Sequence, residues 1–152
     1  MIVPSAMATQ HDIDAQCSEL VEGLARAGRA AQRVLARKSD AEKSAALKLA
    51  AAALRAAGPD VLVANERDVA AGEARGLTGA MLDRLKLDPA RLEGIAAAVE
   101  AVADLPDPVG QVIDSSVPAN GLELSRVRIP IGLIGIIYES RPNVTADAAA
   151  PC

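Results

Sequence analysis

A short polar segment, Glu139 to Asn143, follows the most apolar run of the chain and precedes an alanine-rich stretch. In α/β proteins, the loop between a buried strand and the next helix is a common binding edge, and the helix start adds free N–H groups for an anion. Arg141 offers a forked cationic group, and the Asn143 amide can donate to a developing oxyanion. The alternative is a plain turn, in which Asn143 and Thr145 satisfy only the local backbone.

The rest of the chain holds few groups that could carry chemistry. His11 is the only histidine, and the two cysteines, Cys17 and Cys152, have no metal-ligand spacing. These counts exclude a zinc finger, a disulfide framework and a triad with an internal histidine. So few cysteines are typical of a protein of the reducing cytoplasm. We also expect no bound metal. We also expect Cys17 to be a small core residue.

Composition excludes two further classes of protein. The 152 residues are 51% hydrophobic but contain one aromatic residue, Tyr138, and the net charge is −4. An acidic chain without stacking rings is a poor nucleic-acid binder. The longest mainly apolar run, Ile129 to Tyr138, is about half of the roughly 20 residues that a membrane span needs. The first ten residues lack the basic and apolar regions of a secretory signal.

Helical patterns fill the first two thirds of the chain, which must support the polar segment. Ser39 and Glu42 form a capping box, and Asp88-Pro89 is a typical helix start. Apolar spacing with these start and stop signals predicts five helices: 13–36, 40–57, 59–74, 79–85 and 89–103.

Two of these helices have alternative interpretations. The first carries arginines on one side, which predicts a solvated face rather than a nucleic-acid stripe in an acidic chain: Arg26, Arg29, Arg33 and Arg37. In the second, the alanine-rich part 45–57 predicts a close-packed internal helix, with a face for a partner helix as the alternative.

The periodicity changes after the proline-rich stop at 105–110. Residues 111–117 and 122–129 predict two short strands, and Asn120-Gly121 is a hairpin turn signal. The next run, Ile131 to Tyr138, is continuously apolar and predicts a strand buried on both faces of a parallel sheet. Thr145 predicts the cap of a further helix. Pro151 would lie about six residues into that helix, at a cost of about 3 kcal/mol.

The block from Val127 to Asp147 closely resembles the gamma-glutamyl phosphate reductase family, also called glutamate-5-semialdehyde dehydrogenase, within the aldehyde dehydrogenase superfamily. The motif Tyr138-Glu-Ser-Arg-Pro-Asn143 is the most specific part of this resemblance. Other similar features are the helix 43–57 and the segments 64–68 and 82–85. The resemblance extends from about residue 27 to the last residue.

The resemblance implies an α/β fold class. The chain is expected to be the N-terminal part of an aldehyde dehydrogenase-like fold, mainly α-helical, then a β-hairpin and the first strand of a Rossmann-like cofactor domain. The expected organisation is a mobile terminus over 1–11, a helical segment over 12–110, an oligomerisation-like hairpin over 111–130 and a truncated cofactor domain over 131–152. The hairpin implies a homo-oligomer when the enzyme is complete.

The resemblance also implies a reaction. Members of the family reduce L-glutamyl 5-phosphate to L-glutamate 5-semialdehyde with NADPH, in proline synthesis. A cysteine thiolate displaces phosphate to form a thioester, and hydride transfer then releases the aldehyde. By position, Asn143 is similar to the oxyanion donor of the superfamily. The residues expected to border the cofactor are Ile137, Tyr138, Glu139, Ser140, Arg141 and Pro142.

The chain departs from the family in one respect that matters for activity. The nucleophilic cysteine of the family lies downstream, and Cys152 has no base nearby in sequence, so we expect it to be an incidental thiol. Family members are several hundred residues long. We therefore expect this chain to be an inactive first part of a reductase. The alternative is a non-catalytic helical and β-hairpin module that associates with a full-length subunit.

Overall fold

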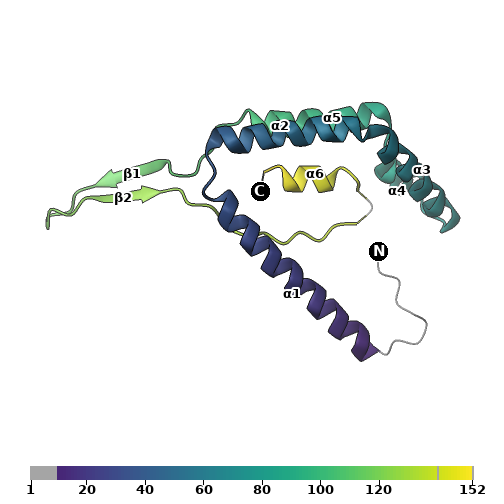
Figure 1. The fold of residues 1–152 in the computed structure, drawn as a ribbon, viewed down its shortest axis with the longest axis horizontal. Helices are drawn as coiled ribbons and strands as arrows, with labels where there is room; N and C mark the ends of the chain where they lie inside the picture. The colour runs from purple at the N-terminus through teal and green to yellow at the C-terminus, as the bar shows by residue number, and fades with distance from the viewer. Residues whose placement is uncertain (1–9, 140, 152) are drawn as a thin grey trace. The chain divides into compact units, whose positions relative to one another are not determined.

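The structure, a computed structural model, describes residues 10–139 and 141–151 (Figure 1). It forms two compact units, one of helix α1 with segment 130–133 and one of residues 38–129 with the residues from 134 onward. The elements are α1 (Gln10–Leu35), α2 (Asp40–Ala56), α3 (Gly58–Ala74), α4 (Gly79–Leu85), α5 (Pro89–Ala103), β1 (Val112–Ser116), β2 (Leu124–Val127) and α6 (Val144–Ala149). The predicted mobile terminus lies outside the described residues, except for its last two residues, which belong to α1.

The predicted helix starts are largely confirmed. The Ser39 hydroxyl accepts a hydrogen bond from the Glu42 amide at 3.3 Å, and the Glu42 carboxylate accepts from the Ser39 amide at 2.9 Å. Asp88 caps α5 by accepting from the Arg91 amide at 2.7 Å. Thr78 precedes α4 as expected, but its side chain makes no capping hydrogen bond.

Helices α2 and α5 lie side by side and form the core of the second unit (Figure 1). Ala51 of α2 and Ala96 of α5 are fully buried at this contact, with Val99 beside them. Small side chains allow two helix backbones to approach closely. Ala146 and Ala150 pack against the same cluster, which anchors α6. The interpretation of 45–57 as an internal helix is wrong for most of its length, because only Ala51 is buried and Leu49 is 72% exposed; the helix packs on α5 along one face.

Ion pairs join α2 to α5 along the exposed side of this contact. Arg55 pairs with Glu93 at 2.7 Å and with Glu100 at 2.6 Å, and Lys48 pairs with Asp104 at 2.8 Å. The Arg55 guanidinium lowers the pKa of both glutamates. Each pair is exposed enough to contribute little on its own, so the pairs mainly fix the register of the two helices.

Strands β1 and β2 pair antiparallel, as the hairpin pattern predicted. The ladder has an irregularity between Val112 and Asp114, and the hydroxyl groups of Ser115 and Ser125 are 3.1 Å apart across it. Every residue of both strands is exposed. The turn is longer than a two-residue hairpin loop, although Gly121 does adopt a left-handed φ of 79°.

The predicted buried strand over 131–138 is not formed. The segment has no strand assignment, and Ile131 is 90% and Ile137 103% exposed. A strand buried on both faces needs neighbouring strands to pair with its backbone, and the described residues supply none beside it. Leu133 instead lies against Gly28 of α1, where an added Cβ would come 2.8 Å from Leu133 Cδ1.

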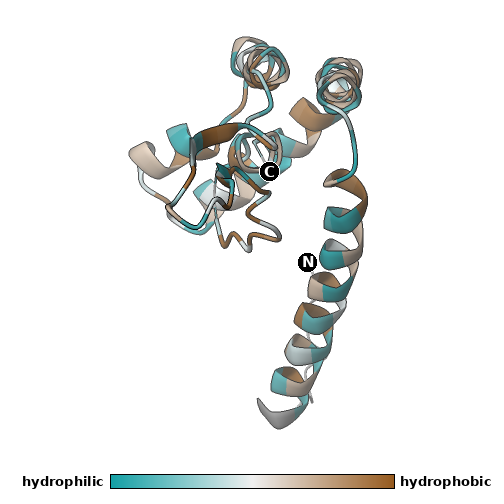
Figure 2. Cartoon of the chain, turned by 90° about the vertical axis from the view of Figure 1, so that its left-hand side faces the viewer, coloured by the Kyte–Doolittle hydropathy of each residue, from teal (hydrophilic) through white to brown (hydrophobic). Residues whose placement is uncertain are grey.

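Helix α1 keeps its apolar residues exposed, and Figure 2 shows hydrophobic and hydrophilic residues interspersed along it. The expectation of a core position for Cys17 is wrong, because this thiol is free and exposed. Helix α1 has 26 residues, and the described part of its unit contains no second helix or sheet that could cover such a side chain. The arginine-rich side is solvated, as predicted. No helix among the described residues is long and apolar enough to cross a membrane.

Candidate functional site

The polar segment ends at the start of α6, and this helix begins two residues earlier than predicted. Asn143, not Thr145, is the N-cap, with φ −65° and ψ −30°. Its carbonyl accepts from the amides of Ala146 and Asp147 at 3.1 and 3.0 Å. Helical backbone angles at Asn143 place Thr145 inside the first turn, where it cannot act as the cap. The helix ends at Ala149, so Pro151 lies outside it and the predicted clash does not arise.

Neither side chain that could have capped this turn does so. The Thr145 hydroxyl is 2.7 Å from that of Tyr138. The Asn143 amide makes no capping hydrogen bond and instead donates from Nδ2 to Oδ2 of Asp147 at 2.7 Å. The plain-turn alternative, in which these side chains serve only the backbone, is therefore not what the structure shows.

The bond to Asp147 determines how the Asn143 amide is oriented. An ionised carboxylate can only accept, so the NH₂ end of the amide must face it. The second N–H of Asn143 is then available to another acceptor. Asn143 is half-buried, so this donor is sheltered but not sealed from a ligand.

A hollow of about 390 Å³ opens beside Asn143. It lies between the end of α4, the connection to α5, one side of α5 and the segment that leads into α6. Its lining residues are Asp83, Arg84, Lys86, Leu87, Arg91, Gly94, Ile95, Ala98, Arg141, Pro142, Asn143 and Asp147.

A second hollow of about 350 Å³ shares Arg84 and Arg141 with the first and is also lined by Glu139. The structure thus brings four of the predicted site residues to these two hollows: Glu139, Arg141, Pro142 and Asn143. Ile137 and Tyr138 line neither hollow. Ser140 and Cys152 lie outside the described residues.

Cationic side chains predominate in the first hollow, four against two carboxylates. Asp83 is paired with Arg91 at 2.7 Å, and Asp147 accepts from Asn143. The other three cations have no ion-pair partner among the described residues: Arg84, Lys86 and Arg141. An anion would complement their charge.

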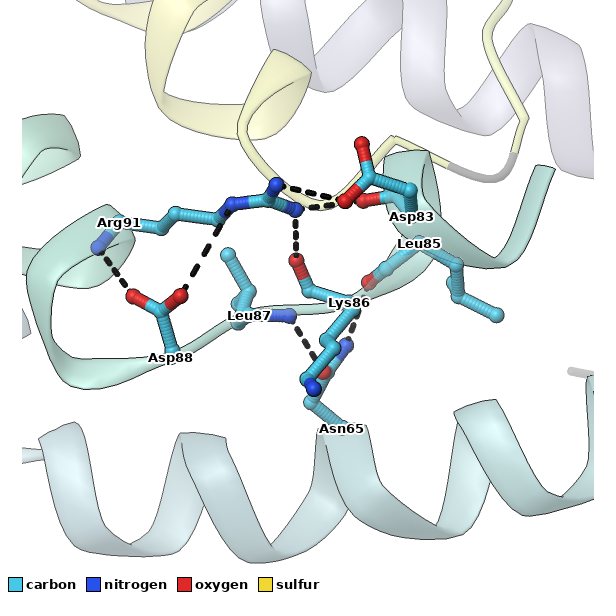
Figure 3. Close-up of polar contacts among 7 residues, drawn as sticks. All are labelled: Asn65, Asp83, Leu85, Lys86, Leu87, Asp88 and Arg91. Atoms are coloured by element: carbon cyan, nitrogen blue, oxygen red, sulfur yellow. Dashed lines mark hydrogen bonds and ion pairs between the residues drawn. The ribbon is translucent and has the colours of Figure 1, made fainter. Parts of the chain in front are cut away.

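The wall formed by residues 85–87 is held by Asn65 of α3 (Figure 3). Asn65 is only 5% exposed; its amide donates to the Leu85 carbonyl at 2.8 Å and accepts from the Leu87 amide at 2.7 Å. Sequence reasoning did not assign Asn65 a role. The available signal was a polar, cap-forming residue in the middle of a predicted helix, a position where asparagine is unfavourable unless its side chain has a specific partner.

Arg91 of α5 holds the same wall from its other side (Figure 3). Its guanidinium donates to the carbonyl oxygens of Asp83 and Lys86, the latter at 2.9 Å, and to the Asp83 carboxylate at 2.7 Å. The Asp88 carboxylate lies 3.9 Å away. Arg91 is therefore occupied by the scaffold and is not a free cation of the hollow. The part of the chain that the structure describes holds no cluster of acidic, histidine or cysteine residues suited to a metal ion.

Curated relatives and solved structures point to one enzyme. The chain is 65% identical over 135 residues to the gamma-glutamyl phosphate reductase of Novosphingobium aromaticivorans, covering 89% of this chain and 32% of the relative. It is 60% identical over 131 residues to that of Rhizorhabdus wittichii, covering 86% and 30%. No protein-family model matches.

Two crystal structures of gamma-glutamyl phosphate reductases share the fold. The Thermotoga maritima enzyme matches with a TM-score of 0.79 at 44% identity, over 83% of this chain and 30% of that one. The Saccharomyces cerevisiae enzyme matches with a TM-score of 0.79 at 33% identity, over 84% and 33%. The chain is thus similar to the N-terminal part of these enzymes and spans about a third of the length of the curated relatives.

Proposed function

We propose that this chain is the N-terminal part of a gamma-glutamyl phosphate reductase, which reduces L-glutamyl 5-phosphate to L-glutamate 5-semialdehyde and phosphate with NADPH in proline biosynthesis. The observation that carries the proposal is the 65% identity over 135 residues to such an enzyme. The geometry agrees with it, because an amide donor, Asn143, borders a cationic hollow. An acyl phosphate needs both features, a donor for its carbonyl oxygen and cations for its phosphoryl group.

In this proposal Asn143 stabilises charge at the reacting carbonyl. When a thiolate from the remainder of the enzyme adds to the acyl carbon, the carbonyl oxygen becomes an oxyanion. The N–H of Asn143 that does not bond to Asp147 is the donor for that oxygen. A fixed donor of this kind is effective because it needs no reorganisation as the charge develops.

The cofactor would lie along residues 137–142, and it supplies the hydride when bound. The described residues fit one border of such a site. Ile137 presents a fully exposed aliphatic side chain, which suits the apolar face of a ring, while Glu139 and Arg141 present polar groups to the adjacent hollows. NADPH rather than NADH, and Ser140 as a further contact, are parts of the proposal that rest on the family resemblance.

The hairpin supports the homo-oligomer that we propose for the complete enzyme. Each strand of the two-stranded sheet has one edge that no strand covers among the described residues. Such an edge can pair with another chain. The cytoplasm is the compartment that we propose, in keeping with the free Cys17 thiol.

The test is a chimera in which this chain replaces the matching residues of the Novosphingobium aromaticivorans enzyme. Its activity is measured in the reverse direction, as NADPH formed from L-glutamate 5-semialdehyde, inorganic phosphate and NADP⁺. We expect turnover close to that of the parent enzyme. A folded chimera without activity would contradict the proposal and favour a non-catalytic module.

Within the chimera, Asn143→Ala should lower turnover by about two to three orders of magnitude, the cost of losing one oxyanion donor. Asn120→Ala is the matched control, because Asn120 lies in the hairpin turn, where its side chain accepts only from the nearby Leu122 amide. Equal turnover in the two variants would rule out the role of Asn143.

A further inference from the structure

We propose that the 390 Å³ hollow beside Asn143 binds the phosphoryl group of the substrate, and that Arg84, Lys86 and Arg141 are the residues that hold it. The identity of the molecule that carries the phosphoryl group rests on the proposed function. The anion site itself rests on the charges and contacts of this chain.

The three cations come from three separate parts of the second unit. Arg84 lies on α4, Lys86 lies in the connection between α4 and α5, and Arg141 precedes α6. They are separated by up to 57 residues in sequence, and folding brings them to one hollow. Like charges in one hollow repel each other, and this repulsion is screened by solvent and offset by a bound anion.

Ion pairing does not compensate the charges of these three cations. Carboxylates do neutralise several other cations, namely Arg26, Lys38, Lys43, Lys48, Arg55, Arg91 and Arg126. Arg84, Lys86 and Arg141 have no such partner among the residues that the structure describes. The hollow therefore keeps a surplus of two positive charges, which matches a phosphate dianion.

The wall that carries Lys86 is held by side chains of this chain. Arg91 bonds the Lys86 carbonyl, and Asn65 holds the residues on either side of Lys86 through the Leu85 carbonyl and the Leu87 amide. Figure 3 shows Lys86 between these two holding residues. A fixed backbone lowers the entropy lost when the lysine binds an anion.

The position of Asn143 favours the substrate over the cofactor as the source of the phosphate. In an acyl phosphate, the oxygen that bridges to the phosphorus and the carbonyl oxygen are attached to the same carbon atom. A phosphate site that borders the amide donor therefore places that carbon between the two groups.

The first experiment measures anion binding by this chain without any reaction. Inorganic phosphate is added at constant ionic strength, and the amide resonances of the chain are followed by NMR. We expect saturable shifts at Lys86, Gly94 and Asn143. Arg141→Gln and Lys86→Gln should each weaken binding by about tenfold, the loss expected for one charge-assisted hydrogen bond.

Arg37→Gln removes the same charge from the first unit and is the matched control, with binding expected to be unchanged. The spectrum of each variant reports whether it is folded. If only one of Arg141→Gln and Lys86→Gln folds, that variant alone tests the anion site. Unsaturable shifts of equal size in all variants would overturn the anion site.

The second experiment separates the two sources of phosphate in the chimera. Lys86→Gln should raise the KM for inorganic phosphate about tenfold and leave the KM for NADP⁺ unchanged. A raised KM for NADP⁺ with an unchanged KM for phosphate would overturn the proposal. If the chimera is inactive while phosphate still binds the hollow, the proposed function fails and the anion site stands.

Discussion

The Asn143 amide owes its orientation to one neighbour on the next turn of α6. Its Nδ2 is 2.7 Å from Oδ2 of Asp147, and both residues line the first hollow. Because a carboxylate cannot donate, the reversed amide would place two acceptors in contact and is disfavoured. We therefore propose Asp147 as a positioning residue that acts through Asn143.

Replacing Asp147 tests this coupling in the chimera. Asp147→Ala should lower kcat about tenfold, because the Asn143 amide is then free to rotate away from its productive orientation. The KM for phosphate should not rise, since the change removes a negative charge from a cationic hollow. Asp68→Ala, on the exposed surface of α3, is the control. A raised KM with kcat unchanged would contradict a positioning role.

Among the elements, α2 has the most completely capped start. Glu42 accepts from the Lys38 ammonium at 2.8 Å and from the amide and hydroxyl of Ser39 at 2.9 Å. These bonds, that of Lys38 first, lower the pKa of Glu42 from 4.5 to about 2. The capping box is thus an ionic structure as well as a hydrogen-bonded one.

The pH dependence of this cap follows from the direction of the shift. A lowered pKa in the folded state means that the ionised Glu42 stabilises α2 above pH 4.5, and this contribution is lost as the pH falls toward 2. We expect a carboxyl NMR titration of Glu42 to show this low midpoint. Ser39→Ala should move the midpoint upward, and Ser18→Ala on α1 should not. A titration midpoint of Glu42 near pH 4.5 in the unmodified chain would contradict the capping box.

The contact between α2 and α5 depends on the small side chains at its centre. Ala96 is fully buried against α2, whereas Ala97 on the same helix is exposed. Ala96→Leu should destabilise the chain by about 1–3 kcal/mol, because the added atoms force the helices apart. Ala97→Leu is the matched control and should have little effect. Urea unfolding of both variants measures the difference, and equal stabilities would refute this packing.

For the whole molecule, the notable property is how much apolar surface stays uncovered. The segment from Ile131 to Ile137 and both hairpin strands are largely exposed, and the chain spans about a third of its curated relatives. Large exposed apolar side chains in such number are typical of a protein surface that another part covers. This agrees with the proposal that the chain acts within a larger reductase.

The chain alone should therefore have no NADPH-dependent reductase activity. Neither hollow is lined by a cysteine among the described residues. An assay with L-glutamyl 5-phosphate and NADPH is expected to show no turnover above background. Activity that disappears in a Cys152→Ala variant would contradict this, because it would make that cysteine the nucleophile.

Local signals in the sequence determined the helices and the hairpin. A capping box, an Asp-Pro start and a Gly-Pro stop act through neighbouring residues, so the boundaries of α2, α3 and α5 could be predicted. The polar segment 139–143 could be marked as a candidate site from its place after an apolar run, and the family resemblance supplied the expected roles of its residues. The catalytic role of Asn143 stays a prediction.

Only the tertiary structure decided what surrounds that segment. Asn65 and Arg91 hold the 85–87 wall through contacts with backbone groups up to 22 residues away. A local sequence pattern does not predict which backbone groups such side chains contact. The N-cap of α6 is Asn143 rather than the expected Thr145, because the backbone at Asn143 already has helical angles. The run 131–138 has the composition of a buried strand, but a strand needs neighbours to pair with. Its state is set by which segments lie beside it, because backbone hydrogen bonds in a sheet are made between strands and not within one.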